Sequence, residues 1–230
     1  MPLVPVERWT RLASVYDWQL FLERPTLAAA AQLAAPSAHE HLLDVGTGTA
    51  GLLRELAKAQ PLPARVVGID ASGAMLARAP RLPAGWELVH ADARSLPYDD
   101  SSFDVATATY FLHVLDEGTR RRVVAELARV LKPGGRLVTV TPFVSRSSLT
   151  RALLAPLHRL ALRARGALAG LAPLDPRPEL IESGLFSVRD ARAIARGYPS
   201  LCVLAESRTG GCGNATAAES RLANAWSYDV

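Results

Sequence analysis

Short apolar runs alternate with helix-like stretches through the first two thirds of the chain. The runs that predict strands lie at residues 42–45, 66–69, 87–90, 103–109 and 136–141. Helices are expected at 50–59 and 72–79, and a long amphipathic helix with an apolar face ending at Leu131 precedes the fifth strand. This alternation is typical of a doubly wound α/β domain with a mostly parallel sheet.

The flanking segments extend the same domain. Residues 6–35 predict two helices joined near Glu23 to Pro25, because proline can begin a helix. An Ala-, Leu- and Arg-rich stretch over 147–171 predicts another helical region, and two last strands are expected near 186–189 and 201–205. The expected organisation is a single domain over 1–209, with N-terminal helices at 1–38, a cofactor-binding core at 39–142, a helical cap insertion at 143–175 and C-terminal strands at 176–209. The Gly-, Ala- and Ser-rich residues 210–230 predict a partly disordered tail.

Composition narrows the class of protein. The chain has 230 residues, of which 49% are apolar and 21% charged, as in soluble globular domains. Cys202 and Cys212 are too few for a disulfide framework or a zinc ribbon, which favours a cytoplasmic location. No apolar run approaches the ~20 residues that span a bilayer. The net charge of +4 comes without an aromatic-basic ladder, so nucleic acid is not an expected partner.

A glycine-rich turn follows the first predicted strand. Gly46, Gly48 and Gly51 have the G-x-G-x-x-G spacing, in which glycine lets the backbone approach a ligand closely. This spacing alone suits either a dinucleotide or another nucleoside cofactor. Asp44, two residues before the turn, would repel a pyrophosphate but suits an ammonium group.

Two further acids follow the next two strands. Asp70 ends the second strand, where a carboxylate can accept from ribose hydroxyls, and Asp92 follows the third, where it can accept from an adenine amino group. Each acid taken singly would more often be a surface or capping residue. Together with Asp44 they predict a nucleoside-cofactor site at one edge of the sheet.

In order and spacing, these segments resemble the motifs of class I S-adenosylmethionine-dependent methyltransferases. The likeness covers about residues 42–142 and is greatest to the subgroup of quinone-biosynthesis and small-molecule enzymes. The matching segments are Asp44–Gly48, Asp70–Leu76, Asp92–Ala93, Leu96–Asp104 and Leu131–Leu137.

The resemblance implies a Rossmann-like, seven-stranded, mostly parallel sheet with an antiparallel last strand, an N-terminal helical lid and a helical cap insertion. It also implies S-adenosylmethionine as cofactor, S-adenosylhomocysteine as product and no metal. The acceptor would be a small or lipid-like molecule, methylated on carbon, oxygen or nitrogen. The residues that it assigns to the cofactor are Tyr16, Asp44, Gly46, Thr47, Gly48, Asp70, Ala71, Met75, Asp92, Ala93, Thr109 and Tyr110. Tyr16 has a second interpretation, an aromatic side chain packed in the core.

Methyl transfer needs no fixed catalytic residue, because the cofactor brings the reactive group and the protein positions the acceptor. A base is needed only if the acceptor must lose a proton. His113, which follows the fourth strand, is the candidate base for a phenol or enol. The alternative is a structural histidine that is hydrogen-bonded beneath the loop.

The predicted helix over 147–171 carries Arg151, Arg159 and Arg163 on one face and leucines on another. Such a helix can lie in a membrane interface, or it can cap the substrate pocket with its arginines in water. Both interpretations suit a hydrophobic acceptor.

Two other classes of function stay open at this point. An NAD(P)-dependent oxidoreductase would use the same glycine turn but needs a Tyr-x-x-x-Lys or comparable pair, and lysine occurs only at positions 58 and 132. A non-catalytic, methyltransferase-like binding protein would keep the cofactor motifs without turnover. The sequence predicts no particular oligomeric state.

Overall fold

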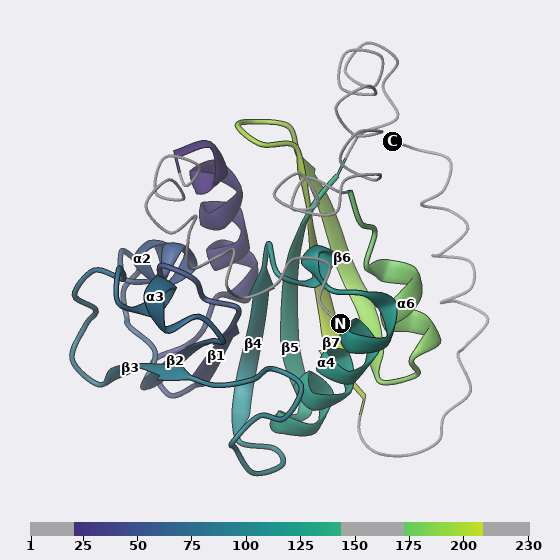
Figure 1. Ribbon diagram of the computed structural model, residues 1–230, viewed down its shortest axis with the longest axis horizontal. Helices are drawn as coiled ribbons and strands as arrows, with labels where there is room; N and C mark the ends of the chain where they lie inside the picture. Colours follow the sequence, from purple (N-terminus) through teal and green to yellow (C-terminus); the bar gives the residue numbers. More distant parts are fainter. Residues whose placement is uncertain (1–20, 144–172, 209–230) are drawn as a thin grey trace.

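The computed structural model describes residues 21–143 and 173–208 of the chain (Figure 1). Three predictions lie outside the described residues: the lid with Tyr16, the basic helix over 147–171 and the tail over 210–230. The proposed domain boundaries likewise stay predictions. Among the described residues, no helix is both long enough and apolar enough to cross a membrane.

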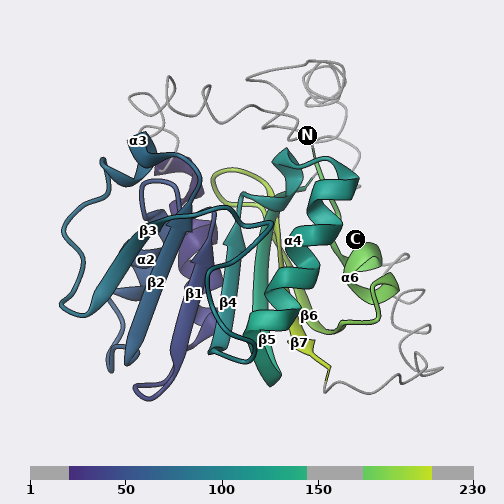
Figure 2. The same ribbon diagram turned by 60° about the horizontal axis from the view of Figure 1, so that its bottom comes forward.

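A seven-stranded sheet forms the centre of the described part (Figures 1 and 2). Its strand order is β3-β2-β1-β4-β5-β7-β6. β7 runs antiparallel to both of its neighbours, whereas the other neighbouring strands pair in parallel. The sequence-based prediction of a mostly parallel sheet with an antiparallel last strand is therefore confirmed. The strands are β1 His41–Val45, β2 Arg65–Asp70, β3 Trp86–His90, β4 Phe103–Thr109, β5 Leu131–Pro142, β6 Phe186–Ile194 and β7 Ser200–Ser207.

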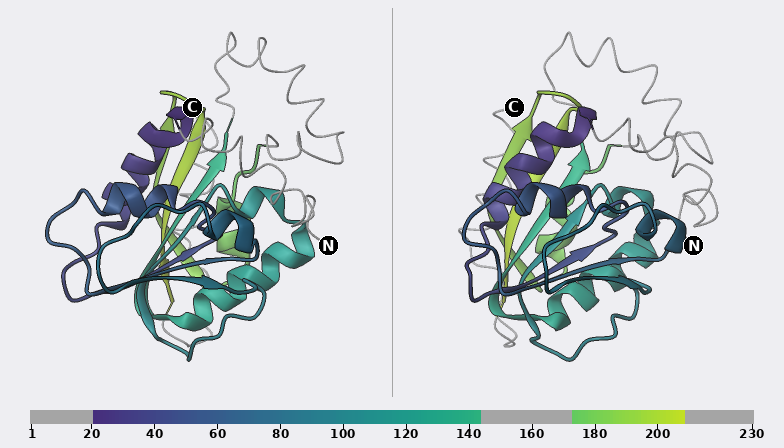
Figure 3. Two further views of the ribbon diagram at one scale, coloured as in Figure 1. Left: turned by 60° about the vertical axis from the view of Figure 1, so that its left-hand side comes forward. Right: turned by 90° about the vertical axis from the view of Figure 1, so that its left-hand side faces the viewer.

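Helices cover both faces of this sheet (Figure 3). One face packs against α4 and α6, whose buried side chains share a core with Leu43, Ala106 and Leu137. The other face packs against α2 and a helix over 21–34, in a core with the alternate strand residues Leu42, Val105 and Val138. The named helices are α2 Gly51–Leu56, α3 Gly73–Leu76, η1 Leu112–Val114, α4 Glu117–Val130 and α6 Arg177–Glu182.

This arrangement determines where a ligand can bind. The helix after β1 lies on one face of the sheet and the helix after β4 on the opposite face, although the two strands are neighbours. The connections therefore part at the carboxyl ends of β1 and β4 and leave a crevice there, the usual ligand position in open α/β sheets.

Three helix predictions were wrong in their extent. The helix expected at 72–79 is only α3, which ends at Leu76. The helix over 21–34 runs through Pro25 without the break expected there. Pro25 has no N–H to donate within the helix, and the Leu22 carbonyl accepts from the Tyr198 N–H at 3.0 Å. α2 ends at Leu56, not at residue 59, because Lys58 and Ala59 donate to carbonyls three residues back and tighten the chain into turns.

The fifth strand begins earlier than the apolar pattern suggests. α4 ends at Val130, and Leu131 is already extended, with φ −75° and ψ 138°. Pro133 disfavours helical geometry at the residue before it, so the chain leaves the helix at this point. Gly134 takes a φ of +74°, as expected for the glycine after the proline. α6 was not predicted at all.

Candidate functional site

A pocket opens at the carboxyl ends of the first four strands, in the crevice described above. Eight of the residues predicted to bind a cofactor line it: Gly46, Gly48, Asp70, Ala71, Met75, Asp92, Ala93 and Tyr110. Sequence reasoning missed the other lining residues, which are Ile69, Ser72, Ala91, Arg94, Phe111, Val114, Leu115, Thr119 and Val123. Six of these nine residues are apolar, and four of the six lie in or next to η1 or in α4: Phe111, Val114, Leu115 and Val123. The pocket therefore has a polar wall at the strand ends and an apolar wall at η1 and α4.

The glycine turn after β1 fits closely under Phe111. Gly46 has a φ of +71°, and a Cβ atom on it would lie 2.4 Å from the Phe111 ring. Both the backbone angle and the contact therefore require glycine at this position. Gly48 also has a positive φ, and its N–H points to Asp70.

Asp44 is a buried carboxylate directly before this turn, with 1% of its surface exposed. Its Oδ1 accepts a hydrogen bond from the Thr107 hydroxyl at 2.7 Å, whereas its Oδ2 has no hydrogen-bond partner among the described residues. Burial raises the pKa of Asp44 to about 6, against the opposing effect of the Thr107 hydroxyl. A buried carboxylate oxygen without a partner is suited to receive a cation.

Asp70 lies at the end of β2 and holds the glycine turn in place. Its Oδ2 accepts from the Gly48 N–H at 2.9 Å, and its Oδ1 accepts from the Ser72 N–H at 2.8 Å. Burial raises the pKa of Asp70, and these two N–H groups oppose the effect. Each carboxylate oxygen has a second lone pair, so the side chain can still accept hydrogen bonds from hydroxyls in the pocket.

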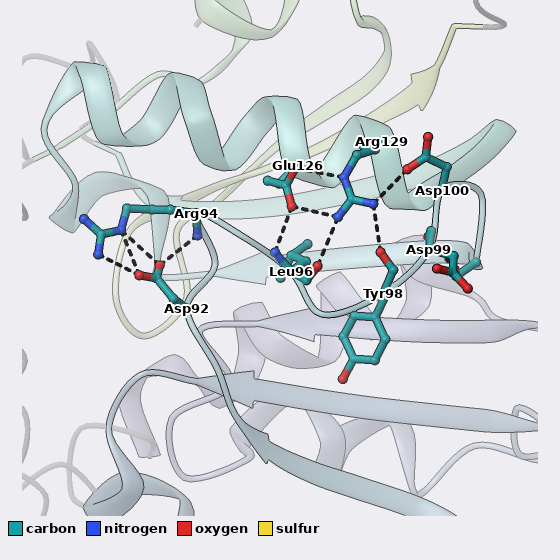
Figure 4. Close-up of polar contacts among 9 residues, drawn as sticks. Asp92, Arg94, Leu96, Tyr98, Asp99, Asp100, Glu126 and Arg129 are labelled. Carbon is teal, nitrogen blue, oxygen red and sulfur yellow. Dashed lines mark hydrogen bonds and ion pairs between the residues drawn. The ribbon is translucent and has the colours of Figure 1, made fainter.

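Asp92 lies at the end of β3, but its carboxylate already has a partner (Figure 4). Arg94 forms a two-nitrogen ion pair with it, with Nη2 2.6 Å from Oδ2 and Nε 3.0 Å from both oxygens. The hydrogen bond from Arg94 lowers the pKa of Asp92. The pair is about half exposed, with 48% of the Asp92 side chain and 51% of the Arg94 side chain accessible.

A network around Arg129 of α4 fixes the loop that follows Asp92 and Ala93 (Figure 4). The Arg129 guanidinium donates to the carbonyls of Leu96 and Tyr98 at 3.1 and 2.8 Å. It also pairs with Glu126, which in turn accepts from the Leu96 N–H at 2.8 Å. One side chain of α4 thus sets the path of the loop beside the pocket.

Replacing Arg129 with methionine is expected to lower the free energy of unfolding by about 2 kcal/mol, because two loop carbonyls lose a charged donor. The melting temperature should fall by about 5 °C, and amide exchange over 92–101 should accelerate. Arg121→Met on the same helix is the control, since the Arg121–Glu117 pair is about two-thirds exposed and contributes little. Equal effects of the two variants would contradict this role of Arg129.

Tyr110 connects the pocket wall to β7. Its backbone has a φ of +52°, and its N–H donates to the Val140 carbonyl at 2.8 Å. Its hydroxyl lies 2.7 Å from Oγ of Ser200, which donates to the Tyr198 carbonyl. Burial raises the pKa of Tyr110 above its usual value, so the phenol stays protonated. The ring is therefore held as a neutral wall of the pocket.

Besides Asp44, three predicted site residues within the described ranges do not line the pocket. Thr47 is buried in the glycine turn and donates its N–H to the Ile69 carbonyl. Thr109 is half-buried at the end of β4, one residue before Tyr110. His113 is 4% exposed in η1, with its ring centroid 6.4 Å from that of Tyr110. Its role as a base stays a prediction. Within the described ranges, no cluster of side chains is suited to hold a metal ion.

The part of the chain that is similar to known proteins contains this site. The profile of the methyltransferase domain family matches residues 42–135, from β1 to the turn within β5. Demethylmenaquinone methyltransferase of Clavibacter sepedonicus is 42% identical over 135 residues, which are 57% of this chain and 51% of that one. The O-methyltransferase cnsE of Penicillium expansum is 40% identical over 111 residues, 45% of this chain and 38% of that one. The chain thus spans about half the length of the first of these relatives.

Solved structures share the fold at low sequence identity. N-methyltransferase NodS of Bradyrhizobium japonicum, in complex with S-adenosylhomocysteine, has a TM-score of 0.59 at 15% identity, covering 82% of this chain and 88% of that one. The [4+2]-cyclase SpnF has a TM-score of 0.60 at 20% identity, covering 81% and 82%. This fold therefore serves more than one chemistry, and function must be argued from the site. The sheet topology and the profile match over residues 42–135 show that this part of the chain is similar to the methyltransferase domain family.

Proposed function

We propose that the protein transfers a methyl group from S-adenosylmethionine to a small apolar or lipid-like acceptor. The observation that carries this proposal is the pair of acids around the glycine turn. Asp44 offers a buried oxygen that lacks a partner among the described residues, and Asp70 offers a carboxylate in the pocket wall. A pyrophosphate beside the Asp44 carboxylate would be repelled, so these acids favour S-adenosylmethionine over NAD(P).

Different residues of the site would bind the methionyl, ribose and adenine parts of S-adenosylmethionine. Asp44 would take the ammonium of the methionyl part, beside the backbone of Gly46 and Gly48. Asp70 would accept from the ribose hydroxyls, and Met75 and Phe111 would contact the apolar faces of the adenosine. When bound, the cofactor supplies an electrophilic methyl group on its sulfonium. The chain's own contribution is to orient the two reactants and to exclude water with the apolar wall.

The apolar pocket wall and the names of similar proteins both support the proposed class of acceptor. The pocket wall formed by Phe111, Val114 and Leu115 is apolar. Relatives that match the chain over part of their length are named as demethylmenaquinone methyltransferases and as an O-methyltransferase. A quinone precursor or another phenol-like molecule is therefore the acceptor class that we propose, with cytoplasmic location as part of the proposal. Proton removal by His113 would be needed only for an acceptor that ionises on methylation.

Calorimetric titration with S-adenosylhomocysteine, with NADH in parallel, tests the cofactor. We expect saturable binding of S-adenosylhomocysteine that weakens about 10- to 100-fold in Asp70→Ala, because a charged acceptor for two hydroxyls is lost. Asp190→Ala, on β6 and outside the pocket lining, is the control and should bind as the parent does. Asp70→Asn and a melting curve for each variant separate lost binding from lost folding.

The other outcomes decide between the remaining functions. Binding of NADH without S-adenosylhomocysteine would replace the proposal with an oxidoreductase. Binding of S-adenosylhomocysteine without transfer of labelled methyl groups to any of a panel of quinols, phenols and amines would favour a non-catalytic binding protein.

A further inference from the structure

At the end of the pocket next to β3, a hydrogen-bond donor, Arg94, lies beside an acceptor, Asp92. None of the roles proposed above uses Arg94. Arg94 lines the pocket together with Asp92. Asp92 Oδ1 accepts from the backbone N–H of Arg94 at 2.8 Å and from Nε at 3.0 Å. Oδ2 accepts from Nε at 3.0 Å and from Nη2 at 2.6 Å. A carboxylate has about four lone-pair positions, so Arg94 occupies the capacity on which an adenine amino group would depend.

The Arg94 guanidinium also has hydrogen-bond donors that Asp92 does not use. Its Nε and Nη2 face Asp92, whereas its Nη1 makes no hydrogen bond within the residues that the structure describes (Figure 4). About half of the Arg94 side chain is exposed. An exposed ion pair of this kind contributes little to stability and is easily rearranged.

Such a pair is complementary to two different purine edges. A 6-aminopurine presents an amino donor next to the N1 acceptor, and a 6-oxopurine presents a carbonyl acceptor next to the N1–H donor. An acid alone serves the first edge and repels the carbonyl of the second, because buried or half-buried acceptors without a donor are unfavourable. An acid with a movable guanidinium serves both edges.

We propose that the Asp92–Arg94 pair allows this pocket to bind 6-oxopurine nucleoside ligands as well as 6-aminopurine ones, with Arg94 as the residue that sets this specificity. The inference rests on the proposed function, since it assumes that the nucleoside part of S-adenosylmethionine lies at this end of the pocket. Arg94 acts in two ways here: it competes with the adenine amino group for Asp92, and it donates to a 6-oxo group.

The test compares S-adenosylhomocysteine with its deaminated analogue S-inosylhomocysteine by calorimetry, on the full chain and on Arg94→Met. In the parent protein the two dissociation constants should lie within about tenfold of each other. In Arg94→Met, S-adenosylhomocysteine should bind about two- to fivefold more tightly, because an exposed competing ion pair is removed. S-inosylhomocysteine should bind about tenfold more weakly, because its carbonyl loses a charged donor.

A matched control exists in the same chain. Asp190-Ala191-Arg192 on β6 repeats the sequence Asp-Ala-Arg and forms the same type of ion pair away from the pocket. Arg192→Met should leave both dissociation constants unchanged, which separates the position of Arg94 from the general loss of a positive charge. Arg94→Lys keeps a cation but not the planar fork and should give intermediate values for both ligands.

Each remaining outcome is informative. If S-adenosylhomocysteine binds but the ratio of the two dissociation constants is the same in parent and Arg94→Met, the inference fails and the proposed function stands. If S-inosylhomocysteine does not bind the parent protein at all, the inference fails in the same way. If neither ligand binds any of the folded proteins, the proposed function and the inference fail together.

Discussion

Replacing Asp44 with asparagine is expected to abolish cofactor binding and, at the same time, to make the protein more stable. The asparagine keeps the size of the side chain and the acceptor for the Thr107 hydroxyl, but it removes the negative charge. If that charge pairs with the cofactor ammonium in a buried position, its loss should weaken S-adenosylhomocysteine binding by more than about 100-fold. Titration calorimetry at pH 8 measures this directly.

The gain in stability follows from the pKa of Asp44, which burial raises from 3.8 to about 6. Between these two values the folded protein holds a proton that the unfolded chain has lost, so this carboxyl makes the free energy of unfolding decrease as the pH rises through the interval. Above pH 6 the destabilisation reaches its full size, about 3 kcal/mol at most. The amide of asparagine does not ionise, so the melting temperature of Asp44→Asn should exceed that of the parent by about 3–6 °C at pH 8 and by less at pH 5.

The protonation of Asp44 also predicts how cofactor binding depends on pH. Affinity for S-adenosylhomocysteine should fall as the pH is lowered through about 6, because protonated Asp44 no longer attracts the ammonium. The control is Glu40→Gln, whose effect on stability should have the opposite sign. The Arg136 hydrogen bonds lower the pKa of Glu40 to about 2, so its charge stabilises the fold at pH 8. An Asp44→Asn variant that binds like the parent would show that Asp44 does not face the cofactor.

Replacing Gly197 with alanine is expected to destabilise the fold by about 3 kcal/mol. Gly197 has a φ of +76°, and a Cβ atom there would lie 2.1 Å from the Leu22 carbonyl oxygen. That oxygen accepts from the Tyr198 N–H, which joins the helix over 21–34 to the turn before β7. The added methyl group must push the helix and the turn apart, on top of the backbone strain of alanine at positive φ.

A second glycine separates the two effects. Gly85 has a φ of +83°, but a Cβ atom on it would meet no atom within 4 Å. Gly85→Ala therefore carries the backbone strain alone, about 1 kcal/mol, and should lower the melting temperature by about 2–4 °C. Gly197→Ala should lower it by about 6–12 °C in the same scanning experiment. Equal shifts would mean that the contact with Leu22 is relieved without cost.

The sequence predicted the strands well because their signals are local. β4 has the predicted bounds, 103–109, and the three acids lie at or just beyond the carboxyl ends of β1 to β3. Apolar runs bounded by turn residues indicate the positions of strands without any knowledge of long-range contacts. For the same reason the pocket edge and the two acids of the glycine turn were predictable, since parallel strands bring their carboxyl ends together.

What the sequence did not reveal depends on segments far apart in the chain. The Thr107 hydroxyl reaches Asp44 only because β4 pairs with β1, and the Tyr110 hydroxyl reaches Ser200 only because β7 lies beside β5. The apolar pocket wall likewise requires η1 and α4 to fold over the strand ends. The ion pair between Asp92 and Arg94 is different, because its residues are two positions apart and the sequence itself contains the local signal for it.

The position of β7 also determines the order in which the sheet can form during synthesis of the chain. Among the described strands, β6 hydrogen-bonds only to β7, and β5 has β7 as its second neighbour. On a ribosome, residues 186–194 emerge before 200–207, so β6 has no place in the sheet until the later segment arrives. During that interval β5 is an open edge that offers unpaired backbone groups to other chains. Nascent chains halted before residue 200 should therefore need chaperones most, although they already contain every acid of the proposed site.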